Sequence, residues 1–227
     1  MAEQVKAKRP YDSPRRRAQA AETRRQILEA AQRLFEQQGY AATTMAAIAA
    51  EARVALKTVY VAFETKSGVL RSLWHLLLRG DEGDAPVAER QWYRAVLEEP
   101  DPERQVRLMA GSSRTVKERA GQMLGVIRSA APVDPDIAEL WGRIQAEFYD
   151  NQRAIVESLE QKKALRPGLD VTGATDILWT LNHPDVWLLL AGERDWTPEQ
   201  WERWFRDTIC AQLLKPAGPA GSRDRPS

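Results

Sequence analysis

Hydroxyl and ammonium side chains occur together between Thr43 and Lys66, and the chemistry that suits them is hydrogen bonding to nucleic acid. Thr43 and Thr44 stand before a short predicted helix, where a hydroxyl group can cap the helix and, with the free backbone amides, bind a phosphate. Lys57 lies near the start of the next predicted helix, from which a lysine can reach the O6 and N7 atoms of guanine. We therefore expect this segment to contact DNA.

Other kinds of site find little support in the residue types. The sequence has one cysteine, Cys210, and two histidines, His75 and His183, which show no zinc-ligand spacing. A serine or cysteine nucleophile with a paired histidine and carboxylate is not recognisable, and neither is a phosphate-binding loop. We therefore expect no enzymatic activity, no cofactor and no metal site.

The charge of the chain is divided unevenly. Residues 1–80 hold 14 Lys and Arg against 7 Asp and Glu, whereas residues 81–227 hold 19 against 25, so a net charge of +7 precedes one of −6. This division favours a polyanion-binding head on a body that need not touch the polyanion. The alternative is an accidental distribution of charge.

The elements that must position these residues are helices, because apolar residues recur with a period of 3.6 and alternating stretches are rare. We predict an all-α fold with an N-terminal three-helix helix-turn-helix domain, residues 21–80, in which the helix-turn-helix spans about residues 44–63. A larger helical effector-binding and dimerisation domain follows over residues 81–215. A flexible basic arm, residues 1–20, and a flexible tail, residues 216–227, flank the two domains.

Several helix boundaries have local causes. The first helix is expected over residues 22–38 and ends at Gly39, a position suited to a left-handed backbone. A break at Gly111 separates two helices over residues 102–112 and 115–129. Thr197, Pro198 and Gln200 together predict a capping box at the start of the last helix.

The order of residues in the head resembles the DNA-binding domain of the tetracycline-repressor (TetR) family. The resemblance covers roughly residues 20–80 and rests on separate elements that occur in the family's order. These elements are the stretch TRRQILEAA at residues 23–31, Leu34-Phe35, Gly39-Tyr40, the stretch TTMAAIA at residues 43–49, Thr58-Val59-Tyr60, Phe63 and Lys66.

The resemblance implies a homodimer whose two recognition helices enter successive major grooves of double-stranded operator DNA, about 34–36 Å apart. It implies that the Tyr60 hydroxyl and the Lys66 ammonium group contact the DNA backbone, and that Thr58 faces the groove. Lys57 is our candidate for the main specificity residue, its alternative being a phosphate contact or a solvated lysine. Exposed apolar side chains such as Val61 could contact thymine methyl groups, unless this face is partly buried.

Three departures from the family pattern affect the turn and the recognition helix, and one of them is Lys57, which stands where the family often has glycine. Arg53 stands where the family often has glycine, so it must adopt a left-handed conformation or use a different turn. Ala55 stands where a capping serine is frequent, which leaves this helix start less well satisfied.

The N-terminal segment is basic and has no apolar stretch of the kind that directs export, so we expect a cytoplasmic protein. Its Arg15, Arg16 and Arg17 could enter the minor groove or lie along phosphates, or could give only non-specific affinity. The longest apolar run, residues 186–191, is too short to cross a bilayer.

The larger domain contains seven of the eight tryptophans and a long helix whose apolar stripe is interrupted by Gln152. This glutamine meets a ligand or partner, or is rotated to solvent. The resemblance favours an effector pocket between the middle helices, with ordinary core packing as the alternative for each residue. The candidate lining residues are Trp92, Met109, Met123, Ile127, Trp141, Phe148, Tyr149 and Gln152.

The last helices are apolar on more than one face, which is typical of a four-helix interface between two subunits. The candidate interface residues are Trp187, Trp201, Trp204, Phe205 and Ile209.

We therefore expect a DNA-binding transcriptional regulator, a repressor that releases its operator when a small apolar or aromatic effector binds. The alternatives are a ligand-independent architectural DNA-binding protein and a small-molecule enzyme.

Overall fold

The computed structural model describes residues 14–79 and 86–216, and within these ranges the secondary structure is helical apart from one isolated β-bridge between Leu165 and Leu214. The all-α fold is therefore confirmed. The chain divides into two compact units, residues 1–73 and residues 74–227. Helix α4 (Lys66–Arg79) is continuous across this division and so contributes residues to both units.

The N-terminal unit is built from α1 (Pro14–Ala42), α2 (Met45–Glu51), α3 (Leu56–Phe63) and the first turns of α4. Each short helix buries one face in a common core, as the 3.6 period requires. The largest fully buried side chains of this core are Ile27, Phe35, Ile48, Leu70 and Leu73.

The expected start of the first helix is wrong. Helix α1 begins at Pro14, so residues 14–20, assigned to a flexible arm, are helical. Arg, Ala and Gln fill this stretch and all favour helix, while a proline at the first helical position loses no hydrogen bond. Gly39 has φ +77°, the positive value predicted for it, and interrupts the helical geometry near the end of α1.

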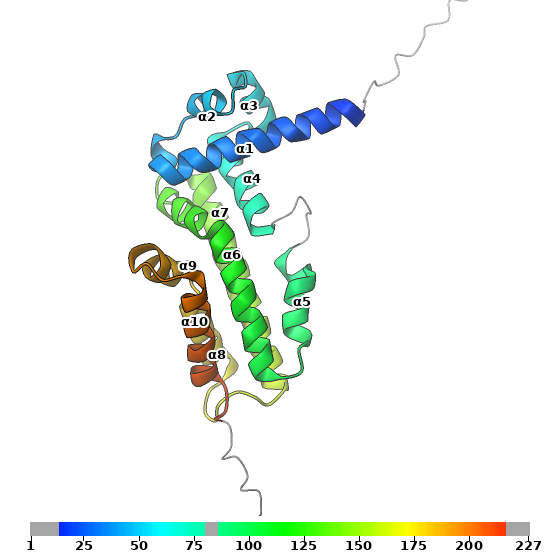
Figure 1. The fold of residues 1–227 in the computed structure, drawn as a ribbon, viewed down its shortest axis with the longest axis vertical. Coiled ribbons are helices and arrows are strands. Elements are labelled where there is room, and N and C mark those ends of the chain that lie inside the picture. The colour runs from blue at the N-terminus through cyan, green and yellow to red at the C-terminus, as the bar shows by residue number, and fades with distance from the viewer. Residues whose placement is uncertain (1–13, 80–85, 217–227) are drawn as a thin grey trace, which may run out of the picture. The chain divides into compact units, whose positions relative to one another are not determined.

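The C-terminal unit is a bundle in which the two longest helices, α6 and α7, run through the centre (Figure 1). Helix α6 packs against α5, α7, α9 and α10, and α7 packs against α8. The elements are η1 (Val87–Glu89), α5 (Gln91–Glu98), α6 (Pro102–Ala130), α7 (Pro135–Gln161), α8 (Val171–Leu181), α9 (Pro184–Trp187), the π-helical turn η2 (Leu188–Glu193) and α10 (Pro198–Leu213).

The predicted break at Gly111 does not occur, because α6 continues through it. A glycine inside a helix lowers stability by only about 1 kcal/mol. The packing of α6 against its neighbouring helices outweighs this cost. Here α10 approaches closely, and a Cβ atom on Gly111 would lie 3.6 Å from the Glu202 carboxylate. The capping box at Thr197 is confirmed: its hydroxyl accepts from the Gln200 amide, and the Gln200 side chain accepts from the Thr197 amide.

None of the helices in the described ranges is long and apolar enough to cross a membrane.

Gly68, in the first turn of α4, is required by a close backbone approach. A Cβ atom at this position would lie 2.2 Å from the carbonyl oxygen of Phe63, at the end of α3. We expect Gly68→Ala to lower the free energy of unfolding by about 1–3 kcal/mol, because backbone must shift to relieve the clash. Urea denaturation measures this change.

Gly142→Ala is the matched control for this prediction. Gly142 lies inside α7, and no atom is within 4 Å of the position of its added Cβ. The same substitution there should stabilise the protein by up to about 1 kcal/mol. Equal effects at the two glycines would show that the close approach at Phe63 has no energetic weight.

Candidate functional site

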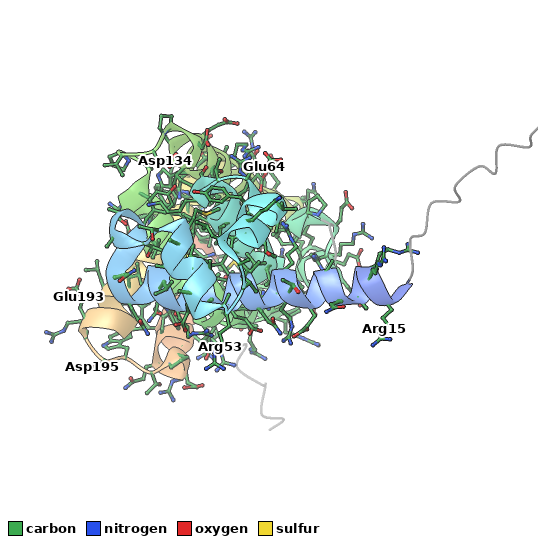
Figure 2. The ribbon with its side chains drawn as sticks, turned by 90° about the horizontal axis from the view of Figure 1, so that it is seen from above. Arg15, Arg53, Glu64, Asp134, Glu193 and Asp195 are labelled. Carbon is green, nitrogen blue, oxygen red and sulfur yellow. The ribbon has the colours of Figure 1, made fainter. Side chains whose placement is uncertain are left out.

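The turn between α2 and α3 is a left-handed helix end with arginine in the position that usually holds glycine. The Arg53 amide donates to the Ala50 carbonyl at 3.1 Å, and the Val54 amide donates to the Ala49 carbonyl at 3.0 Å. These two bonds are those of a Schellman motif, and Arg53 has φ +55°. Of the two alternatives for Arg53, a left-handed conformation or a different turn, the structure has the first, and it brings an exposed arginine to the helix-turn-helix surface (Figure 2).

The start of α2 is capped as predicted, since the Thr44 hydroxyl accepts from the Ala47 amide at 3.0 Å. Thr44 is exposed, so its side chain and the first amides of α2 can meet a phosphate. The start of α3 has no side-chain cap, which agrees with the prediction for Ala55.

Helix α3 buries one face and presents the other to solvent. Val59 and Phe63 belong to the core of the N-terminal unit, whereas Lys57 is exposed and Thr58 is partly exposed. The exposed face also carries large apolar side chains, which a surface with no partner would rarely hold together. Their exposed fractions are 42% for Leu56, 48% for Tyr60 and 76% for Val61.

Arg24 of α1 holds the end of α3, a role that the sequence did not reveal. Its guanidinium donates to the Ala62 carbonyl at 2.6 Å and to the Ser72 hydroxyl at 2.9 Å, and lies 4.1 Å from the Phe63 ring centroid. The sequence places Arg24 in the 23–31 stretch beside Arg25, and nothing in the residue pattern tells the roles of the two arginines apart. Packing alone distinguishes it as a residue that positions the exposed helix.

Two predicted DNA contacts are engaged inside the N-terminal unit instead. Thr43 is fully buried and donates to the Gly39 carbonyl at 2.8 Å, so its assignment as a DNA-binding residue is wrong. The neighbouring Thr44 caps α2, so the Thr43 side chain is not needed as a cap and packs in the core. Lys66 is partly buried; its ammonium group donates to the Tyr40 and Thr43 carbonyls at 2.8 and 3.0 Å and lies over the Tyr40 ring. Its phosphate contact remains a prediction.

Arg15, Arg16 and Arg17 lie on the first turn of α1, which extends beyond α2 and α3 (Figures 1 and 2). All three side chains are exposed. Because they are helical, they do not form the extended arm that a minor groove admits. The part of the expected arm over residues 1–13 lies outside the described residues.

A cavity lies in the C-terminal unit between α4, α5, α6, α7 and the start of α9. Its empty volume is about 920 Å³, including the opening to solvent. Four of the predicted pocket residues line it, namely Trp92, Met109, Phe148 and Gln152.

The other four predicted pocket residues do not line this cavity. Met123 and Ile127 are buried in the core, and Trp141 is partly buried on α7. Tyr149 points to α8, where its hydroxyl donates to the Asp176 carboxylate at 3.0 Å. Periodicity located the apolar face of each helix but not the part of that face that borders the cavity.

The sequence reasoning missed a polar cluster in the cavity wall. Lys117 of α6 donates through its ammonium group to the Asn182 side-chain oxygen at 2.6 Å, and the Asn182 amide donates to Gln152 at 3.0 Å and to Ser113 at 3.2 Å. All four residues line the cavity. Gln152 is therefore buried rather than rotated to solvent. Lys117 interrupts the apolar stripe of α6 as Gln152 interrupts that of α7. The sequence therefore contained the signal that would have identified Lys117, a polar residue at a buried helix position.

Burial governs the titration of this cluster. It lowers the pKa of Lys117 to about 7, because the ammonium form loses its hydration inside the domain. Burial also lowers the pKa of the neighbouring His183, with the Asp185 carboxylate acting in the opposite direction.

The predicted dimer contacts are for the most part core residues of the chain itself. Trp187, Trp201, Phe205 and Ile209 are buried within one subunit, where Trp201 stacks on Phe205 at 4.8 Å between ring centroids. Their assignment to an interface is wrong, because α6 and α8 pack against α10, and α6 packs against α9, within the same chain. Trp204 alone of the five remains partly exposed.

The capped helix α2, the left-handed turn at Arg53 and the exposed helix α3 together form a helix-turn-helix, the arrangement of many DNA-binding domains. Residues 27–73 match the family described as "Bacterial regulatory proteins, tetR family". The N-terminal unit therefore contains a DNA-binding domain of this family, and the chain as a whole is similar to transcriptional regulators.

Individual relatives agree with this assignment. The probable HTH-type transcriptional regulator ArpR of Pseudomonas putida is 26% identical over 211 residues, which cover 89% of this chain and 97% of ArpR. Two solved structures share the fold. SmeT of Stenotrophomonas maltophilia, in complex with triclosan, has a TM-score of 0.68 at 18% identity and covers 91% of this chain and 99% of its own. NalD of Pseudomonas aeruginosa has a TM-score of 0.65 at 21% identity, covering 87% and 98%.

Lys57→Ala tests the predicted specificity residue. If Lys57 contacts a guanine, its removal should cost about 1–3 kcal/mol on the preferred operator and relax the base preference at one position per half-site. Binding to a set of operators with single base changes, followed by fluorescence anisotropy, measures both effects. Equal weakening on every sequence, with a smaller salt dependence, would make Lys57 a phosphate contact instead.

Lys117→Met tests the burial of the charge. Between pH about 7, where the folded lysine loses its proton, and the model-peptide value of 10.5, the unfolded state binds more protons, so stability rises with pH. We expect the wild type to gain up to about 1.4 kcal/mol per pH unit relative to Lys117→Met in this window.

Urea denaturation of both proteins at two pH values one unit apart, both above neutral, measures this difference. Other titrating groups are common to the two proteins and cancel. A stability difference that does not change with pH would show that Lys117 titrates as an exposed lysine does.

Proposed function

We propose that this protein is a ligand-responsive repressor, which binds operator DNA as a homodimer and releases it when a small apolar or aromatic compound occupies the C-terminal cavity. The observation that carries this proposal is that helix α4 contributes residues both to the cavity and to the N-terminal unit. Its Trp74 and Leu78 line the cavity, and the same continuous helix begins with Lys66 and Gly68 in the N-terminal unit. A compound that displaces the last turns of α4 therefore acts on a helix that the DNA-binding unit shares.

The end of α4 is held from α6. The Arg119 guanidinium donates to the carbonyls of Leu77 and Leu78, the second at 2.9 Å. These carbonyls belong to the last turn of α4, where backbone acceptors lack helical partners. Arg119 thus ties the cavity helix α6 to α4 by two directed bonds, and a shift of one helix is transmitted to the other.

In the proposed complex, three side chains on the exposed face of α3 contact DNA. Lys57 would contact guanine, Val61 thymine methyl groups, and the Tyr60 hydroxyl the backbone. Thr44 at the start of α2 would add a phosphate contact, as would the exposed arginines on the first turn of α1. Names of relatives agree with repression, since NalD is a secondary repressor and SmeT the repressor of a multidrug efflux pump.

The proposed homodimer uses the outer side of α8 and α10, which pack against each other in the C-terminal unit (Figure 1). Trp204 and Ile177 remain partly exposed on these helices. A second copy of the chain is the occupant that a two-fold symmetric operator requires, because each half-site takes one recognition helix.

A band-shift experiment with the DNA upstream of the protein's own gene tests the proposal. Specific binding that is reversed by the small-molecule fraction of a cell extract supports a ligand-responsive repressor. Specific binding that is indifferent to the extract supports a ligand-independent architectural protein instead. Absence of specific binding contradicts both.

Ser112→Phe should separate release from binding. Ser112 lines the cavity, so a phenyl ring there fills space that an effector needs. We expect the variant to bind the operator as the wild type does and to resist release by extract, so that at least about ten times more extract is required. Ser112→Ala, which adds no volume, is the control. Normal release from Ser112→Phe would place the effector elsewhere.

A further inference from the structure

The charge of Lys117 has no counter-charge in the described part of the chain. Its side chain is 6% exposed, and its ammonium group contacts the neutral Asn182 side chain and the Trp201 ring, 4.6 Å from the centroid. No carboxylate of the described residues forms an ion pair with it. A buried cation without an anion is an expensive arrangement, which an apolar residue of similar size would avoid.

Packing does not account for a lysine at this position. Along α6 the neighbouring buried positions hold small or apolar residues, including Ala110, Ala120 and Leu124. An unbranched apolar side chain such as methionine has the length to fill the same space. The hydrogen bond to Asn182 explains a donor at this position but not a charge, because a neutral hydroxyl or amide donor would satisfy the Asn182 oxygen as well.

The cluster lies where a ligand can reach it. Lys117, Asn182, Gln152 and Ser113 line the cavity, and the aromatic rings of Trp74, Trp92 and Phe148 contribute to the same wall. The wall holds one carboxylate among the described residues, that of Glu147, whose side chain is exposed on α7. The cavity therefore combines extensive apolar surface with one buried group of positive charge, and that combination is complementary to an amphipathic acid.

We propose that the effector of this cavity is an aromatic or other apolar organic acid with a single negative charge, whose carboxylate pairs with the ammonium group of Lys117. This inference rests on the proposed ligand-responsive function and specifies its ligand class. Lys117 supplies the charge, and Asn182, held by Gln152 and Ser113, fixes the position of the ammonium group. The rings of the wall enclose the apolar part of the acid.

Calorimetric titration of the full-length protein without DNA tests the inference with a matched pair of probes, biphenyl carboxylate and biphenyl carboxamide. The two have nearly the same shape and differ in charge. We expect the wild type to bind the carboxylate at least about ten times more tightly than the carboxamide, as expected for a charge-assisted hydrogen bond. In Lys117→Met the affinities should become equal within about two-fold, through loss of carboxylate binding alone.

Proton uptake gives a second readout. Near neutral pH part of the Lys117 population is unprotonated, because burial lowers its pKa to about 7. Pairing with a carboxylate favours the protonated form, so carboxylate binding should take up a fraction of a proton, seen as a dependence of the heat on the buffer. The carboxamide and the Lys117→Met variant should show no such dependence.

Lys162→Met is the matched control. Lys162 is also partly buried in this domain and donates to the Glu99 carbonyl and to Gln105, yet it does not line the cavity. Its replacement should leave both probe affinities unchanged. Far-ultraviolet circular dichroism and urea denaturation confirm that each variant is folded.

The outcomes separate this inference from the proposed function. Equal affinities of the two probes, a carboxylate preference that persists in Lys117→Met, or binding of neither probe would overturn the inference, while the extract experiment would still test repression. If the carboxylate binds through Lys117 and does not displace operator DNA, the assignment of the acid site stands and the proposed release mechanism fails.

Discussion

The continuity of helix α4 is the constraint on which the rest of this protein depends. Its 14 residues form one α-helix, so a continuous series of backbone hydrogen bonds links its first turn to its last. The first turn is fixed by the close approach of Gly68 to the Phe63 carbonyl. The last turn is fixed by Arg119. The wall residues Trp74 and Leu78 therefore belong to the same continuous helix as residues that pack in the core of the N-terminal unit.

Polar residues inside apolar helix faces carry the functional information in the larger domain. An α-helix that only needs a core has no use for Lys117 or Gln152 at buried positions, because each must find hydrogen-bond partners there. The two helices solve this by sharing Asn182, which bridges them at the cavity wall. Burying these polar groups costs free energy only at the cavity wall. They are also the polar groups that a molecule bound in the cavity would meet.

Sequence reasoning succeeded where the cause is local. The Thr44 cap, the missing cap at Ala55 and the box at Thr197 depend on neighbouring residues and were predicted, and the left-handed Arg53 was one of two alternatives. The exposed side of α3 followed from the same short-range pattern. It failed where the cause is distant. The apolar faces of α10 showed that two sides are buried, but a sequence does not say whether the cover is another helix of the same chain or a second subunit. The cavity could not be located from the sequence for a similar reason. Apolar residues that line a cavity and apolar residues that pack in a solid core recur with the same helical period.

The surface of α3 suggests how affinity and specificity are divided in the N-terminal unit. Its exposed face has a single ammonium group, Lys57, beside the apolar Leu56 and Val61, so it offers few charges to phosphates. The positive charge lies instead on the first turn of α1 and at Arg53, outside α3. Phosphate contacts contribute most of the salt-dependent affinity, whereas base edges are read by hydrogen bonds and methyl contacts. Arg53 keeps its left-handed backbone at a strain of about 1–2 kcal/mol, and glycine there would remove a charge from the exposed surface of the helix-turn-helix.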